Sequence, residues 1–100
     1  MSDYIVSPQA QEDIFSNWCY LAKYASIETA NKVEGAITEG FQALAQSPAK
    51  GHRRAELTSH PVLFYQVYSY LIVYRRTAPI EIVRVLHGRR NIPLLLGSIS

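Results

Sequence analysis

Apolar positions in the first quarter of the chain predict a short strand followed by a helix. Residues 3–6 are strand-like, and Ser7 and Pro8 are typical of an N-cap and a first helical turn. Apolar residues then recur every three or four positions, as they do on one face of a helix. We interpret Trp18 as a core residue rather than a binding residue. The predicted buried face contains Ala10, Ile14, Trp18, Leu21 and Ala25, with Phe15 and Ala22 at its margins.

The same spacing continues after Ser26, which is expected to cap a second helix. Gly35 and Gly40 lie inside this helix, where each costs about 1 kcal/mol relative to alanine. We therefore expect these small residues to let another element approach closely. The helix is predicted to end at Ser47-Pro48, and the short connection makes the two helices antiparallel neighbours. Its predicted buried face contains Ala30, Val33, Ile37, Phe41 and Leu44.

The second half of the chain contains stretches that are rich in β-branched and aromatic residues. They predict strands at residues 62–68, 70–76 and 80–87, with a tight turn near Ser69. The last of these strands has apolar residues on both faces, which is typical of a central strand that is covered on both sides. Gly88 then ends this strand.

The predicted order of elements is β-α-α-β-β-β, followed by a helical turn that Asn91 caps. The predicted fold class is α+β, with a single domain at residues 1–100. We expect the helix hairpin to pack on one face of a small, mainly antiparallel sheet. The other sheet face, or an edge, is then left to be covered by something other than the helix hairpin.

Composition favours a globular protein without disulfides or membrane segments. The chain has 100 residues, of which 48% are hydrophobic, which is enough for a core. Cys19 is the single cysteine, and we interpret it as a small apolar residue on its helix. Because a single cysteine cannot form an intrachain disulfide, the sequence is consistent with a reducing compartment. Residues 1–4 lack the features of a secretory signal, and no apolar run reaches about 20 residues. We therefore expect a cytoplasmic protein.

The positive charge of the chain lies in its second half. Residues 1–49 contain two lysines against six acidic residues, a net charge of −4. Residues 50–100 contain one lysine and seven arginines against two glutamates, a net charge of +6. Such a field attracts nucleic acid or an acidic protein surface, and a solvated basic face without a partner is the alternative.

Most of these cations come from the last two strands and the residues after them, together with several tyrosines. If the strands pair as a hairpin, the guanidinium groups are predicted to crowd one end of the sheet, where a partner would neutralise them. Arginine suits phosphate or carboxylate groups, and His87 is the member that can exchange protons near neutral pH. The tyrosines are interpreted either as core residues or as a protein-binding surface. The candidate target- or partner-binding residues are Tyr70, Tyr74, Arg75, Arg76, Arg84, His87, Arg89 and Arg90.

The sequence contains no motif for metal or nucleotide chemistry. The histidines are scattered, and neither a His-Glu-x-x-His nor a Cys-x-x-Cys pair occurs. There is no glycine-rich phosphate loop, and Cys19 lies among apolar neighbours in mid-helix, which disfavours a nucleophile. We therefore expect no catalytic residues, no metal ion and no cofactor.

Three segments together resemble toxins of the ParE type, within the RelE/ParE superfamily. Tyr4–Ile14 resembles their first strand and Ser-Pro-x-Ala helix start, with acidic residues in the first turn. Tyr70–Arg75 is similar to their hydrophobic strand that ends in Tyr-Arg, and Ile80–Arg90 is similar to their last strand and its exit. The segments occur in the family's order and cover nearly the whole chain.

The resemblance implies the toxin of a type II toxin–antitoxin system. ParE-type toxins bind DNA gyrase and block it in a state with broken DNA, which stalls replication. A cognate antitoxin, ParD-like or similar, neutralises the toxin by folding a disordered tail onto it, so a hetero-oligomer is expected. The tail is expected on the open sheet face and in the groove beside the helix hairpin. We expect no membrane partner and no sequence-specific binding of nucleic acid by the toxin alone.

The related RelE-type toxins share the fold but cut messenger RNA on the ribosome, which is the alternative function. Such cleavage needs a base, an acid and cations, roles that His87, Arg84 and Arg75 partly match. Gly88 follows His87 where an aromatic residue would stack on a base, and no lysine lies on the predicted strands. These departures favour the gyrase inhibitor. A third hypothesis is an inactive or purely structural member that is retained for binding an antitoxin or for plasmid maintenance.

Overall fold

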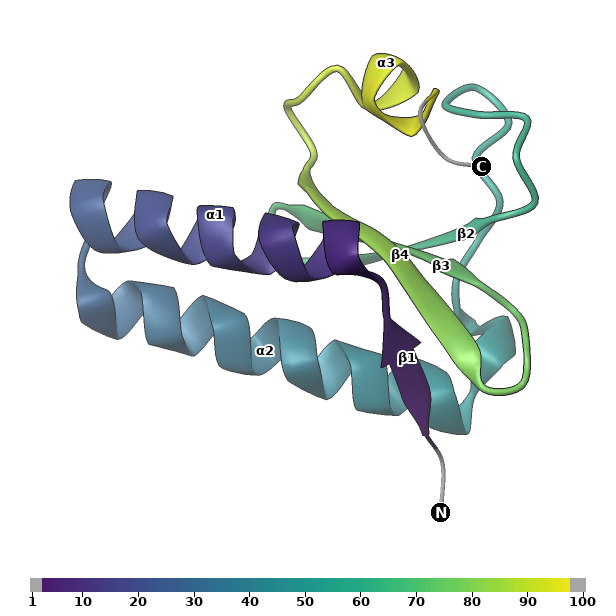
Figure 1. Ribbon diagram of the computed structural model, residues 1–100, viewed down its shortest axis with the longest axis horizontal. Helices are drawn as coiled ribbons and strands as arrows, with labels where there is room; N and C mark the ends of the chain where they lie inside the picture. Colours follow the sequence, from purple (N-terminus) through teal and green to yellow (C-terminus); the bar gives the residue numbers. More distant parts are fainter. Residues whose placement is uncertain (1–2, 98–100) are drawn as a thin grey trace.

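The computed structural model describes residues 3–97 and confirms the predicted order of elements. A short strand precedes two long helices, and three further strands precede a short final helix (Figure 1). Among residues 3–97, no helix is long and apolar enough to cross a bilayer. The elements are β1 (Tyr4–Val6), α1 (Pro8–Tyr24), α2 (Ile27–Gln46), the 3-10 helix η1 (Pro48–Lys50), β2 (Leu63–Val67), β3 (Tyr70–Arg75), β4 (Ile80–His87) and α3 (Ile92–Leu96).

The four strands form one sheet in the order β1-β4-β3-β2. β1 runs parallel to β4 and the other neighbours are antiparallel, so the prediction of a mainly antiparallel sheet is confirmed. Tyr68 and Ser69 form a tight turn between β2 and β3, and Tyr68 has a φ of 53°. Left-handed residues are typical of such turns because they match the twist of the two strands. β4 lies between β1 and β3 and is buried on both faces, as predicted.

Side-chain caps begin the two long helices at the predicted residues. Ser7 Oγ accepts a hydrogen bond from the backbone N–H of Ala10, and Ser26 Oγ accepts one from that of Thr29. Ser7 Oγ also donates to the carbonyl oxygen of Val83 on β4 at 2.8 Å, which links the start of α1 to the sheet. The two helices lie side by side on one face of the sheet (Figure 1), so the predicted helix hairpin is confirmed.

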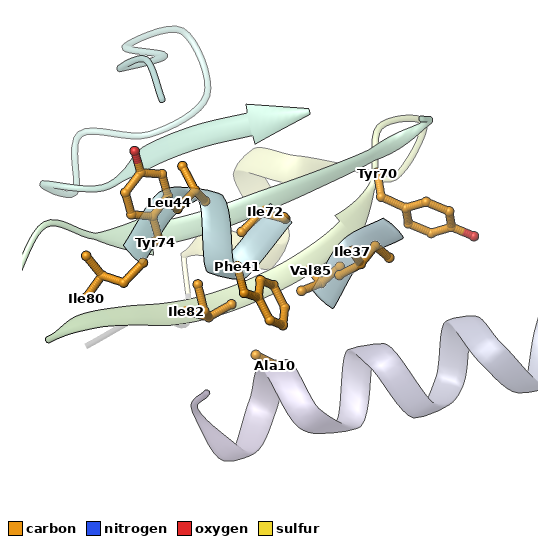
Figure 2. Packing of buried hydrophobic residues seen from close by; sticks show 10 residues of the cluster. All are labelled: Ala10, Ile37, Phe41, Leu44, Tyr70, Ile72, Tyr74, Ile80, Ile82 and Val85. Carbon is orange, nitrogen blue, oxygen red and sulfur yellow. The ribbon is translucent and has the colours of Figure 1, made fainter. Parts of the chain in front are cut away.

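The main core lies between this helix hairpin and the sheet. Figure 2 shows side chains of α2 facing those of β3 and β4. Alternate residues of β3 contribute to it because successive side chains of a strand point to opposite faces. The buried residues of this core are Ala10, Ile37, Phe41, Leu44, Tyr70, Ile72, Tyr74, Ile80, Ile82 and Val85.

Gly40 on α2 allows the helix to approach the sheet closely. A Cβ atom there would lie 2.9 Å from Cδ1 of Ile72 and 3.1 Å from Cγ2 of Val67. Gly35 differs, because it is exposed and a Cβ atom there would meet nothing within 4 Å. The expectation of a close approach is therefore confirmed at Gly40 and wrong at Gly35.

The second face of the sheet is covered by the chain itself. Figure 1 shows α3 on the side of the sheet opposite the helix hairpin, next to the loop before β2. Asn91 Oδ1 accepts a hydrogen bond from the N–H of Leu94, which confirms the predicted cap of this final turn. The expectation of an open sheet face is wrong, because both faces of the central strands are apolar and need cover. The buried residues on this side are Val62, Phe64, Leu71, Val73, Val83, Leu86, Ile92 and Leu96.

α1 is less buried than its apolar spacing predicts. Phe15 is 69% exposed, and Cys19 and Ala25 are also exposed. Trp18 is half-buried, and its Nε1–H donates to Oδ1 of Asn31 on α2 at 2.9 Å, so its interpretation as a core residue is wrong. The reason is the position of α1, whose C-terminal half extends beyond the sheet and has α2 as its neighbouring helix (Figure 1).

Candidate functional site

The prediction that the cations crowd one end of the sheet is wrong, because the register of β3 and β4 separates them. In the register of the two strands, Arg75 lies opposite Glu81 near the turn between the strands, whereas Tyr70 lies opposite His87 at the other end. A strand of this length places Arg75 roughly 17 Å from Tyr70, at about 3.3 Å per residue. Arg76 belongs to the first end, and the two arginines after His87 belong to the second.

Arg84, in the middle of β4, is bound to α1. Its Nε and Nη2 groups donate to Oδ2 and Oδ1 of Asp13 at 2.7 and 3.0 Å, and both side chains are less than 15% exposed. The backbone N–H of Val85 donates to the same carboxylate at 3.0 Å. Hydrogen bonding to Asp13 raises the pKa of Arg84. Arg84 is therefore a structural link between α1 and the sheet.

The arginines near the turn between β3 and β4 differ in their surroundings. Arg75 Nη1 lies 3.0 Å from Oε1 of Glu81, and both side chains are partly exposed. Arg76 is exposed to solvent. The carboxylate of Glu81 offsets the positive charge of Arg75, so this end of the sheet is less basic than the sequence indicates.

Tyr74 belongs to the core and offers no surface to a partner. Its side chain is 0% exposed, and its hydroxyl donates to the carbonyl oxygen of Pro48 at 2.6 Å and accepts from the N–H of Gly51 at 2.9 Å. Burial raises the pKa of Tyr74. Figure 2 shows its ring and that of Tyr70 at opposite ends of the core.

The other four candidate residues lie together in a groove between α1 and the end of β4. They are Tyr70, His87, Arg89 and Arg90. The groove has a volume of about 510 Å³, which lies within the range of small-ligand sites. None of the residues that line it is acidic. We name it the basic aromatic groove, and its lining residues are Ser16, Asn17, Tyr20, Tyr70, His87, Arg89 and Arg90.

Local contacts hold the groove's aromatic and polar groups in place. The Tyr70 and His87 rings meet edge to face, with centroids 5.2 Å apart. His87 Nδ1 accepts a hydrogen bond from the backbone N–H of Arg89 at 3.1 Å, so Nε2 carries the proton of the neutral ring. Asn17 Nδ2 donates to the carbonyl oxygen of Val85 at 3.3 Å and thereby links α1 to β4.

The charged groups that line the groove are hydrogen-bond donors, whereas its hydroxyl and amide groups can donate or accept. Burial, and secondarily the nearby Tyr20, raise the pKa of Tyr70, so its hydroxyl remains protonated. The guanidinium groups of Arg89 and Arg90 donate only, and His87 can donate through Nε2 because its Nδ1 accepts a hydrogen bond from the Arg89 N–H. Such a site suits an anionic group flanked by a flat or apolar one.

Sequence reasoning missed the part of the groove that α1 provides. Ser16 and Tyr20 lie one helical turn apart and so share a face, which is a signal present in the sequence. Their proximity to His87 depends on the docking of α1 beside β4, which no local pattern in the sequence predicts.

Arg84 and Arg75, which with His87 partly match the catalytic set of an endoribonuclease, do not line the groove. Within residues 3–97, no three His, Cys, Asp or Glu side chains lie close enough to hold a metal ion.

Comparison with known proteins identifies the family of the chain. The model of a family described as "ParE toxin of type II toxin-antitoxin system, parDE" matches residues 4–92. A search of curated proteins gives no match. Among solved structures, a chain of the "Chromosomal ParDE TA system from P. aeruginosa" has a TM-score of 0.73 and 19% identity, over 87% of this chain and 96% of that chain. This likeness confirms the predicted α+β fold, and the family model spans most of the sequence. The chain therefore belongs to the ParE toxin family of type II toxin–antitoxin systems.

Proposed function

We propose that this chain inhibits DNA gyrase by binding it, without catalysis of its own, and thereby arrests growth. Membership of the ParE toxin family is the observation that carries this proposal. The basic aromatic groove supports it, because tyrosine and arginine are enriched at the hot spots of protein interfaces. Tyr24 packs against Tyr20 of the groove and extends this surface along α1, and the two tyrosines are 66% and 62% exposed. Gyrase acts in the cytoplasm, which is therefore the proposed location.

The proposed regulator is a cognate antitoxin, ParD-like or similar, that forms a hetero-oligomer with this chain. Because α3 covers the second face of the sheet, the proposed binding site of the antitoxin tail is the outer face of α1 beside the basic aromatic groove. The net charge of +6 in residues 50–100 favours an acidic tail. Binding of the tail there would cover the surface that we propose for gyrase.

Gyrase inhibition is tested by adding the purified chain to a supercoiling assay. We expect loss of supercoiling with accumulation of cleaved DNA, and recovery when the antitoxin is added. The double variant Arg89→Ala/Arg90→Ala is expected to weaken inhibition about tenfold, since arginines at an interface centre dominate affinity. The matched control is Arg53→Ala/Arg76→Ala, which removes two exposed arginines outside the groove. Gyrase that stays fully active at high concentrations of the chain contradicts the proposal.

A purified translation system separates this proposal from the RelE-like alternative. We expect the messenger RNA to remain intact when the chain is added. Cleavage that disappears in His87→Ala would instead support a ribosome-dependent endoribonuclease. If expression without the antitoxin leaves growth unchanged, the hypothesis of an inactive member is supported.

A further inference from the structure

Arg89 and Arg90 in the basic aromatic groove lack the ion pairs that three other arginines of the described residues form. Within residues 3–97, ion pairs join Arg54 to Glu56, Arg75 to Glu81 and Arg84 to Asp13. Arg89 and Arg90 form no ion pair with a described residue. They are adjacent in the chain and lie beside His87 in a groove without a carboxylate. Both cations line the same groove and like charges repel each other, so a bound anion would stabilise the groove.

Aromatic rings lie next to these cations. Tyr20 lines the groove, is 62% exposed, and packs against Tyr24 with the ring centroids 4.9 Å apart. Lys23 Nζ lies 5.2 Å from the centroid of the Tyr24 ring. On the other wall, Tyr70 is held edge to face against His87. The groove therefore combines unpaired guanidinium groups with an accessible ring on which a planar group can stack.

We propose that the basic aromatic groove binds single-stranded nucleic acid without sequence preference. One phosphate would lie at Arg89 and Arg90, because guanidinium forks match phosphate oxygens. One unpaired base would stack on Tyr20, and such stacking accepts any base because every base has a π-face. The volume of about 510 Å³ accommodates a ligand of this size. This activity goes beyond the proposed function, because it requires no gyrase.

Two other ligands fit the groove less completely. A DNA duplex holds its bases in pairs inside the helix, so they cannot reach Tyr20 while a phosphate contacts Arg89. An acidic peptide supplies carboxylates for the arginines, but glutamate and aspartate have no ring to stack on Tyr20. The arrangement of cations beside an exposed ring therefore favours a nucleotide over either ligand.

Fluorescence anisotropy with a labelled strand of about ten thymidine nucleotides tests the proposal. We expect Arg89→Ala/Arg90→Ala to weaken binding about tenfold and to lower the magnitude of the slope of log affinity against log salt by about 0.7, the value for the loss of one phosphate contact to a single strand. The matched control Arg53→Ala/Arg76→Ala, with the same loss of charge, should change affinity less than about twofold. Tyr20→Ala should weaken binding about tenfold, whereas Tyr20→Phe, which keeps the ring, should bind like the wild type.

All the substituted residues are exposed, and urea unfolding of each variant verifies that it folds. Equal weakening by the two double variants would overturn the proposal in favour of a general positive field. Competition by a duplex of equal length as strong as that by the single strand would also overturn it. Equally tight binding of an oligoglutamate of equal charge would show an acidic-protein site instead. Absence of binding to the strand while gyrase is still inhibited would refute this inference and leave the proposed function standing.

Discussion

Asp13 on α1 and Arg84 on β4, which lie 71 residues apart in the chain, form a two-point ion pair with N–O distances of 2.7 and 3.0 Å. The Asp13 carboxylate also accepts a hydrogen bond from the backbone N–H of Val85. With side chains only 12% and 14% exposed, this pair joins the first helix to the central strand at a site largely shielded from water. The prediction that Asp13 lies in the first helical turn is wrong, because α1 begins at Pro8 and its first turn contains no acidic residue. Only the structure shows that the partner of Asp13 is Arg84.

Asp13→Ala is expected to lower the free energy of unfolding by about 3–5 kcal/mol. The substitution leaves the Arg84 charge largely buried without its carboxylate, which costs more than the pair itself contributes. Urea unfolding followed by circular dichroism measures the loss. The control is Glu81→Ala, whose pair with Arg75 is 25% and 35% exposed and should contribute less than about 1 kcal/mol. Equal losses in the two variants would contradict the assigned role.

Tyr74→Phe is expected to lower the free energy of unfolding by about 1–3 kcal/mol. The variant keeps the ring but leaves the N–H of Gly51 and the carbonyl of Pro48 without their partner in the buried site. Thermal or urea unfolding provides the measurement. Tyr68→Phe is the matched control, because Tyr68 is 56% exposed and its loss of a hydroxyl should change little. A stability of Tyr74→Phe equal to that of the control would refute the prediction.

The stabilising contribution of Tyr74 is expected to decline at alkaline pH. Burial raises its pKa above the ordinary value of 10.0, so the folded protein holds the phenol proton more tightly than the unfolded chain. The contribution is therefore fully present below about pH 10 and is lost as pH rises through the folded pKa. The stability difference between the wild type and Tyr74→Phe should be smaller at about pH 11 than at about pH 8. A difference that stays constant would count against the raised pKa.

Gly35→Ala and Gly40→Ala are expected to change stability in opposite directions. At Gly35 a Cβ atom meets nothing within 4 Å, so alanine should stabilise the helix by about 0.5–1 kcal/mol. At Gly40 the Cβ atom would lie 2.9 Å from Ile72, and displacement of that packed side chain should cost about 1–3 kcal/mol. Urea midpoints of the two variants, compared with the wild type, give the signs. Stabilisation at both positions would contradict the prediction for Gly40, because it would show that the Ile72 side chain can move aside at little cost.

Local patterns predicted most of the fold because they report interactions between near neighbours in the chain. Ser7, Ser26 and Asn91 cap the helices through hydrogen bonds that reach three residues ahead. The strands follow from runs of β-branched and aromatic residues, and the central place of β4 follows from apolar residues on both its faces. These features need no knowledge of distant segments.

The candidate site depended on contacts between segments that are far apart in the chain. The register of β3 and β4 places Arg75 at one end of the hairpin and His87 at the other, and buries Tyr74 between them. The docking of α1 brings Tyr20 to His87 and pairs Arg84 with Asp13. The sequence by itself thus determined the elements, their order and the basic character of the second half. Tertiary structure alone decided which cations are neutralised and which line the groove, because burial of the core sets strand register and helix position, and these place the side chains.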